Sequence, residues 1–128
     1  MKENKKLPHN HNHDDHNYME DFSVHNPRLS TIEAVADAMK QLGDPSRLRI
    51  FWLLCHTQEC VANIAALVDM SSPAVSHHLR VLKSAGLIVS RRDGKEMLYK
   101  AADTEMAEAM HQIIENLAQI SCPSEHHK

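Results

Sequence analysis

The sequence predicts a mainly α-helical fold of the α+β class, in which one β-hairpin follows a group of helices. Apolar residues recur every three or four positions in several segments between residues 30 and 120, as in amphipathic helices. Two such segments, 60–68 and 71–86, are joined by only a few residues, which is typical of a helix-turn-helix. Asp93-Gly94 then separates two strand-like segments. Together these observations predict a winged helix-turn-helix with flanking N- and C-terminal helices.

Length and composition indicate one small domain. The chain has 128 residues, of which 42% are hydrophobic and 4% aromatic, so aliphatic side chains must form most of the core. The longest apolar run, residues 50–55, is far too short to span a bilayer, and residues 1–27 lack the pattern of a secretion signal. Three cysteines, an odd number, favour free thiols or metal ligands over disulfides. We therefore expect a cytoplasmic protein with no membrane partner.

The charges of the chain are unevenly distributed. The formal net charge is −3, which by itself disfavours nucleic acid as a partner. In residues 71–100, however, the only acids are Asp93 and Glu96. The cations of this stretch are Arg80, Lys83, Arg91, Arg92, Lys95 and Lys100. Because phosphate binding depends on the local field of one face, the stretch is suited to double-stranded DNA.

Residues 1–27 have the composition of a tail, which cannot bury enough apolar surface to offset chain entropy. Their histidines alternate with Asn and Asp, and these side chains at close spacing suit zinc-like ions. A metal-binding arm, an inert solvated tail and an expression tag all remain open, although a tag normally has uninterrupted histidines. We therefore divide the chain into an arm (1–27), a winged helix-turn-helix domain (28–121) and a Cys/His-containing tail (122–128).

Breakers and capping residues delimit the first helices. Helices are predicted at 30–42, 45–56 and 60–68. Ser30 is the expected N-cap of the first helix and Asp44 that of the second, where Pro45 suits the first turn. The apolar side of the first helix is expected to comprise Ile32, Val35, Ala36, Met39 and Leu42. Asp69 is expected to supply the turn after the third helix, where the usual glycine is missing.

The segment 71–86 has the features of a DNA-recognition helix. Serine and proline at its start and Gly86 at its end are capping signals. Val75, Leu79 and Leu82 form a buried face, and the opposite face contains no acid. The bland alternative is a solvated polar face. The expected DNA-contacting residues are Ser72, Ser76, His77, His78, Arg80 and Lys83, with Arg91, Arg92 and Lys95 from a basic hairpin wing at 87–100.

A last helix is predicted at 103–120. Its apolar stripe, Met106, Met110, Ile113, Leu117 and Ile120, is longer than a small core requires. We therefore expect this helix, with the first one, to form a homodimer interface. A two-fold dimer would place two recognition helices one turn of DNA apart.

Several motifs resemble the ArsR/SmtB family of metal-responsive repressors. These are the segments 42–50 (LGDPSRLRI), 59–61 (ECV) and 76–82 (SHHLRVL), together with the Asp93-Gly94 wing. The resemblance covers roughly residues 31–120, with the motifs in order. It implies a dimeric winged helix-turn-helix that binds operator DNA when metal-free and releases it on binding metal.

The resemblance also implies two places for metal ligands. One combines a cysteine at the start of the third helix, here Cys60, with the partner's arm, here His9, His11, His13, His16 and His25. The other lies on the final helix, where this chain keeps Asp103 but has Glu105, Asn116 and Gln119 in place of the other ligands. Asn and Gln are weak zinc ligands, which disfavours a family-type zinc site there.

Other residues of the chain could also contribute ligands. The additional candidates are Cys55, Asp103, Glu105, His111, Cys122 and His126, and His56 could join Cys55 near Cys60. For Cys55 a buried structural role is the favoured interpretation. The group Glu108, His111 and Glu115 lies opposite the apolar stripe, so we expect these side chains to face solvent.

Three functions follow from these observations. The first is a repressor that releases DNA on binding zinc, or else cadmium, nickel or cobalt. The second is a repressor of the same fold that responds to thiol oxidation or persulfide. The third is a histidine-rich metal buffer without a DNA role. An enzyme is not expected, because the chain has no nucleophile motif, phosphate loop or paired-carboxylate site.

Overall fold

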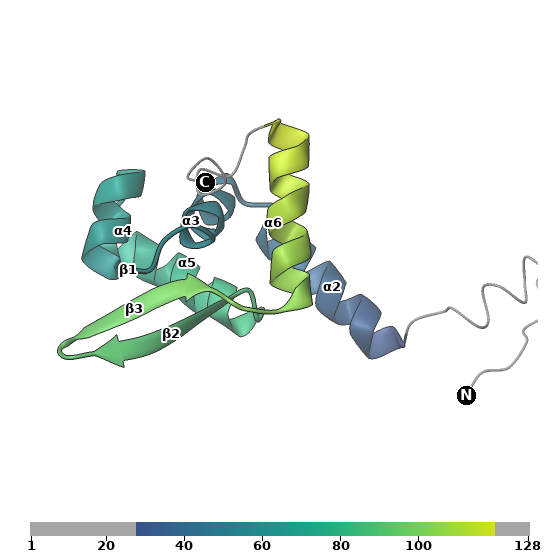
Figure 1. Cartoon of the computed structure of the whole chain (residues 1–128), viewed down its shortest axis with the longest axis horizontal. Coiled ribbons are helices and arrows are strands. Elements are labelled where there is room, and N and C mark those ends of the chain that lie inside the picture. Colours follow the sequence, from purple (N-terminus) through teal and green to yellow (C-terminus); the bar gives the residue numbers. More distant parts are fainter. Residues whose placement is uncertain (1–27, 120–128) are drawn as a thin grey trace, which may run out of the picture. The chain divides into compact units, whose positions relative to one another are not determined.

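A computed structural model describes residues 28–119, and the predicted arm histidines, Ile120 and the C-terminal tail lie outside this range. Contacts divide the chain after Glu33, and the packing described below is that of residues 34–119. The elements are α2 (Leu29–Gln41), α3 (Pro45–Leu54), β1 (Glu59–Cys60), α4 (Val61–Val68), α5 (Ser72–Ser84), β2 (Ile88–Asp93), β3 (Glu96–Ala101) and α6 (Glu105–Ala118) (Figure 1). The predicted mainly helical winged helix-turn-helix is confirmed. Within the described range, no helix is long and apolar enough to cross a membrane.

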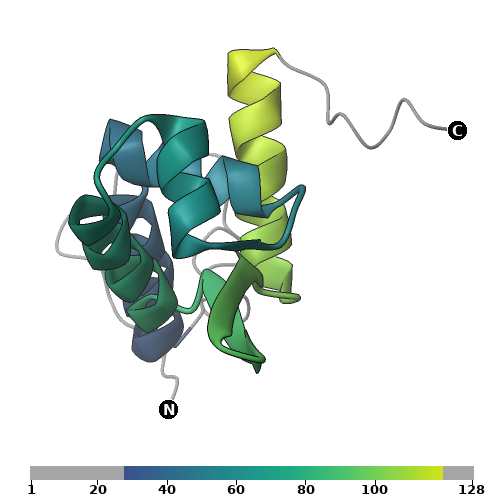
Figure 2. The same ribbon diagram turned by 90° about the vertical axis from the view of Figure 1, so that its left-hand side faces the viewer.

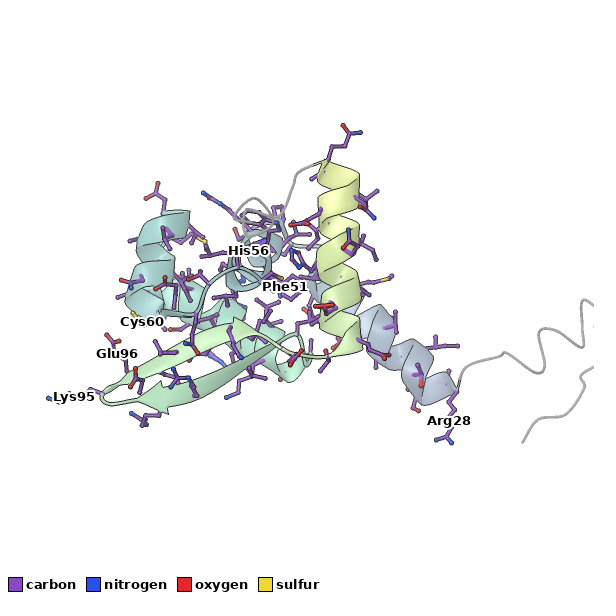
Figure 3. All side chains as sticks on the ribbon, viewed as in Figure 1. Arg28, Phe51, His56, Cys60, Lys95 and Glu96 are labelled. Atoms are coloured by element: carbon purple, nitrogen blue, oxygen red, sulfur yellow. The ribbon has the colours of Figure 1, made fainter. Side chains whose placement is uncertain are left out.

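The hydrophobic core lies beneath α5. Val75, Leu79 and Leu82 are buried on its inner face, as predicted, and they join side chains from α3 and α4. The largest fully buried side chain is Phe51 of α3, labelled in Figure 3. Burying such side chains stabilises the fold by about 1.5–3 kcal/mol each relative to leaving them exposed. The core therefore fixes the orientation of α5.

The sheet has three antiparallel strands in the order β1-β3-β2. β1 pairs with β3 through Glu59 opposite Tyr99 and Cys60 opposite Leu98. The sequence predicts no strand at this point, where Glu59 lies between two predicted helices and Cys60 begins the third, because a two-residue strand is too short to show a period of two. The extra strand attaches the middle of β3 to the segment that precedes α4.

The hairpin turn differs by one residue from the prediction. Asp93 pairs with Glu96, so the two loop residues are Gly94 and Lys95 rather than Asp93 and Gly94. Gly94 has a φ of +67°, and glycine at the first loop position is typical of a type II′ turn. The prediction was wrong because Asp-Gly favours a type I′ turn, in which Asp93 would have to leave the strand.

The helix boundaries also shift. α2 begins at Leu29, so Ser30 lies inside the helix rather than at its cap, and Ala36 and Met39 are exposed whereas Ala38 is buried. Ala38 and Leu42 are buried in the core, and Val35 packs against it as predicted. α3 ends at Leu54, two residues early, and α6 is capped by Thr104, whose side chain accepts a hydrogen bond from the Ala107 amide at 3.1 Å.

Candidate nucleic-acid interface and His–Glu cluster

The helix-turn-helix is formed by α4 and α5. Asp69 adopts the left-handed conformation at φ 57°, as predicted, and its amide donates to the Ala65 carbonyl. Ser71 then caps α5, accepting a hydrogen bond from the Ala74 amide at 3.3 Å. A short polar side chain tolerates the left-handed region better than most residues, so Asp69 replaces the glycine usual in such turns. The turn directs the outer face of α5 away from the core.

The outer face of α5 is exposed and contains no acidic side chain. Its exposed residues include Ser72, Ser76, His77, Arg80 and Lys83. Such hydroxyl, imidazole and cationic groups can donate to phosphates and base edges in a major groove. These side chains are therefore accessible to DNA, and their role in recognition stays a prediction.

The wing is joined to α5 and to the segment before α4 by two hydrogen bonds. Lys83 Nζ donates to Ser90 Oγ at 2.7 Å, and Arg91 Nε donates to Gln58 Oε1 at 3.0 Å. Figure 2, in which the hairpin points toward the viewer, shows α5 beside it. Arg92 and Lys95 are exposed, and Lys95 lies at the tip of the hairpin in Figure 3. The cations of α5 and the wing therefore form one connected surface.

His78 differs from the other predicted DNA-contacting residues because it is half-buried. Burial lowers the pKa of His78 below its ordinary value of 6.5, and the nearby Asp44 carboxylate only partly opposes this effect. The pKa of Asp44 is itself lowered, chiefly because its side chain accepts a hydrogen bond from the Arg47 amide at 2.9 Å. His78 packs near the start of α3, and its lowered pKa favours the uncharged imidazole. Its position favours a packing role over direct base contact.

The two predicted thiol ligands within residues 28–119 differ in burial. Cys60 is a buried free thiol at the N-cap of α4, whereas Cys55 is half-buried at the C-cap of α3. In Figure 3, Cys60 lies beside α4, away from His56. Among residues 28–119, Cys60 does not belong to any group of three metal-ligating side chains.

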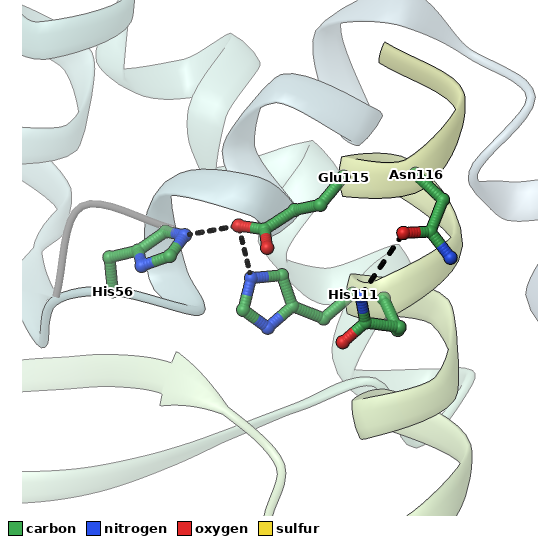
Figure 4. Close-up of polar contacts among 5 residues, drawn as sticks. His56, His111, Glu115 and Asn116 are labelled. Atoms are coloured by element: carbon green, nitrogen blue, oxygen red, sulfur yellow. Dashed lines mark hydrogen bonds and ion pairs between the residues drawn. The ribbon is translucent and has the colours of Figure 1, made fainter. Parts of the chain in front are cut away.

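The structure instead brings together His56, His111 and Glu115 (Figure 4). Glu115 Oε2 lies 2.9 Å from His111 Nε2 and 3.4 Å from His56 Nε2. The His56 ring also contacts Trp52, with 4.6 Å between ring centroids, and meets His111 edge to face at 4.8 Å. The ligand atoms of the three residues all lie within 4.8 Å of one another.

The prediction that His111 and Glu115 face solvent was wrong, although Glu108 is exposed as predicted. Glu115 is 7% exposed and His111 is 21% exposed. The prediction treated only the apolar stripe of α6 as a packing surface, whereas the opposite side packs against the segment after α3. His111 and Glu115 are four residues apart, which places them on one helix face, and this spacing was the available signal.

Asp103 and Glu105, the remaining candidates on the final helix, are exposed. Asp103 precedes α6 and, with Cys55, His56, Glu108 and His111, lines an open pocket of about 370 Å³. Asn116 accepts a hydrogen bond from the Gln112 amide at 3.2 Å, a contact on the surface of α6. The family-type positions on this helix are therefore occupied by exposed side chains.

The sequence of this chain is similar to those of known transcriptional regulators. The profile described as "Bacterial regulatory protein, arsR family" matches residues 44–90. A transcriptional repressor SmtB homolog from Synechocystis sp. is 35% identical over 89 residues, which is 70% of this chain and 67% of that protein. The cadmium resistance transcriptional regulatory protein CadC of Listeria innocua is 42% identical over 67 residues, covering 52% of this chain and 56% of that protein.

The fold is also similar to solved structures. A homodimeric winged helix-turn-helix DNA-binding domain from Mycobacterium bovis, described as a possible ArsR-family transcriptional regulator, has a TM-score of 0.65. It is 28% identical, and the match covers 80% of this chain and 90% of that one. These proteins are transcriptional regulators and not enzymes. From its sequence and its fold, this chain belongs to the ArsR/SmtB family of DNA-binding transcriptional regulators.

Proposed function

We propose that this protein is a homodimeric repressor that binds operator DNA and releases it when a divalent metal ion binds, with zinc as the first choice. The observation that carries the DNA-binding role is the exposed, acid-free outer face of α5. The Lys83–Ser90 hydrogen bond joins this face to the cationic wing. Together they offer donors to a groove and to the flanking phosphates.

An apolar groove supports the dimer. It is lined by Met39, Leu42, Leu48, Met110, Ile113, Ile114, Leu117 and Ala118. Leu117 is 81% exposed and Met39 is 53% exposed in one protomer. A second copy that covers these side chains would remove them from water, and a two-fold arrangement would present two copies of α5 to a palindromic site.

The metal response is supported by the relatives and by the side chains present. One relative is named for cadmium resistance, and another is a homolog of SmtB. Imidazole and carboxylate groups, which suit zinc and its neighbours, gather at α6, and Cys60 and the arm histidines remain proposed ligands as well. A metal ion that binds free protein better than DNA-bound protein would shift the equilibrium toward release.

The thiol-responsive alternative is less well supported by the described residues. Cys60 is 9% exposed, and a reactive thiol needs access to its oxidant. A variant with all three cysteines replaced by serine separates the two proposals. We expect it to keep DNA binding and some metal response, whereas a thiol sensor would lose its response entirely. Membership in a DNA-binding family also argues against a metal buffer as the whole function.

The test uses the full-length protein and DNA. A labelled duplex is first selected by the protein from a random-sequence library in the presence of a chelator. Fluorescence anisotropy at fixed salt then measures its affinity with and without micromolar zinc. We expect tight binding that weakens at least about tenfold with zinc, corresponding to roughly 1.4 kcal/mol of coupling. Unchanged affinity with zinc, cadmium, nickel and cobalt would contradict the metal response, and no selected sequence would contradict DNA binding.

A further inference from the structure

We infer that His56, His111 and Glu115 form a metal site within one protomer, with zinc or a similar divalent transition-metal ion as its ligand. The inference rests on the proposed function and names the side chains that bind its effector. Two imidazoles and one carboxylate are donors that zinc accepts, with the fourth position left for water or a further side chain. Within residues 28–119, this is the one group of three metal-ligating side chains that converge.

The distances are close to those that a tetrahedral ion requires. With zinc–ligand bonds of about 2.0–2.2 Å, two ligand atoms of a tetrahedral site are separated by about 3.3–3.6 Å. Glu115 Oε2 lies 2.9 Å from His111 Nε2 and 3.4 Å from His56 Nε2. The ligand atoms lie at most 4.8 Å apart, so small side-chain rotations would bring all three to one ion.

The burial of Glu115 provides a second argument. At 7% exposure, it is the one charged side chain that is buried within the described range. Burying a carboxylate is unfavourable unless positive charge or hydrogen bonds compensate it. Both imidazoles place a nitrogen within 3.4 Å of this carboxylate, and a divalent cation held by all three side chains would compensate its charge. Within the described chain, no lysine or arginine forms an ion pair with Glu115.

The site also has access to solvent. His56 and His111 both line the open pocket of about 370 Å³, and Cys55, Asp103 and Glu108 lie on its wall. The pocket therefore gives an ion or a water molecule a path to the two imidazoles that contact the buried carboxylate.

The position of the site connects two parts of the protomer. His56 follows α3, which packs against the recognition helix α5, whereas His111 and Glu115 lie on α6. An ion held by all three would fix the end of α3 relative to the helix proposed for dimerisation. Metal binding could then change the separation of the two recognition helices, and DNA binding would in return change metal affinity.

The test measures metal binding directly in the full-length protein. Chelator-treated protein is titrated with zinc in competition with a chromophoric chelator, and the visible absorption of bound cobalt reports the coordination number. We expect His56→Ala, His111→Ala and Glu115→Gln each to weaken zinc binding by more than about 100-fold, because even outer-shell partners of metal ligands typically matter 10- to 100-fold. The cobalt spectrum should lose intensity in each variant.

Matched variants serve as controls. Glu105→Gln, which removes an exposed acid of α6 outside the pocket lining, is the matched control, and Cys60→Ser removes another proposed ligand. Replacement of the five arm histidines by alanine tests the arm. We expect Glu105→Gln to keep zinc affinity within about threefold of the wild type, and the Cys60 and arm variants to weaken it less than the cluster variants do. Melting curves without metal check that each variant folds, and Glu115→Gln, which keeps the side-chain shape, covers the case in which an alanine variant unfolds.

The outcomes separate this site from the proposed function. Weakening by the Cys60 or arm variants together with unchanged affinity in the His56, His111 and Glu115 variants would overturn the site while a metal-responsive repressor stands. Loss of zinc affinity in the cluster variants with no effect of zinc on DNA binding would support the site and contradict the proposed regulation. Absence of zinc binding in the wild type would overturn both.

Discussion

The DNA-facing surface and the His–Glu cluster differ in how the chain assembles them. The surface is formed by one continuous stretch, α5 with β2 and β3, and its polar side chains are exposed. The cluster joins His56 to two residues more than fifty positions later, and its carboxylate is buried. A binding surface for a polyanion needs accessible donors, whereas a site for a small cation needs a few ligands at fixed distances. The two regions therefore depend differently on the core between them.

The largest expected effect comes from that shared core. Leu82 is fully buried beneath α5, so Leu82→Ala should destabilise the protein by about 2–5 kcal/mol through lost burial and a cavity. Urea denaturation measures this change. Because the core holds both α5 and the cluster in position, we expect DNA binding and zinc binding to weaken together. Loss of DNA binding with unchanged stability would show that α5 is held by other contacts.

Arg80→Ala should separate the two regions. Arg80 is exposed on α5, and removing a base or phosphate contact from such a position costs about 1–3 kcal/mol of DNA binding. Anisotropy at fixed salt measures the loss, and zinc affinity and the urea midpoint should not change. Arg28→Ala, which removes an exposed arginine before α2, is the control. Equal DNA affinity for the Arg80 variant and the wild type would contradict the proposed docking face.

Asp44→Ala tests the other end of the helix that precedes His56. Loss of its hydrogen bond to the Arg47 amide should cost about 0.5–2 kcal/mol of stability, as for other N-caps. Ser46→Ala, two residues on, is the matched control and should change stability by less than about 0.5 kcal/mol. Urea denaturation at pH 7 compares them. Equal effects of the two substitutions would show that capping of α3 is unimportant.

The smallest expected effect is a pH dependence at His78. Its pKa is lowered in the folded protein, so below pH 6.5 the unfolded chain takes up a proton that the folded chain does not. The contribution of His78 to stability is therefore full above pH 6.5 and decreases as the pH falls toward the folded pKa. The difference in urea midpoint between the wild type and His78→Gln should accordingly depend on pH between 7.5 and 5.5, because subtraction removes the titration of other groups.

The sequence predicted the continuous region well and the cluster poorly. Val75, Leu79 and Leu82 share one helix face, and Asp69 and Gly86 mark its two ends, with φ values of 57° and 78°. These signals are local, so they could be recognised without the fold. The burial of Glu115 depends on which face of α6 packs against the segment after α3. The strand β1 has only two residues, so it shows no alternation of polar and apolar side chains that would identify it. Both depend on tertiary pairing, which residue spacing does not specify.

The Arg91–Gln58 hydrogen bond joins the wing to the segment that follows His56. Gln58 lies two residues after His56, in the short link between α3 and β1, and Arg91 belongs to the wing. Only Nε of Arg91 donates to the glutamine in this bond, and the guanidinium has further N–H groups that can donate to a DNA phosphate. A phosphate bound by these groups would be connected, through Arg91 and Gln58, to the segment beside His56. If Arg91 joins the phosphate contacts, Arg91→Ala lowers the salt slope of binding by about one.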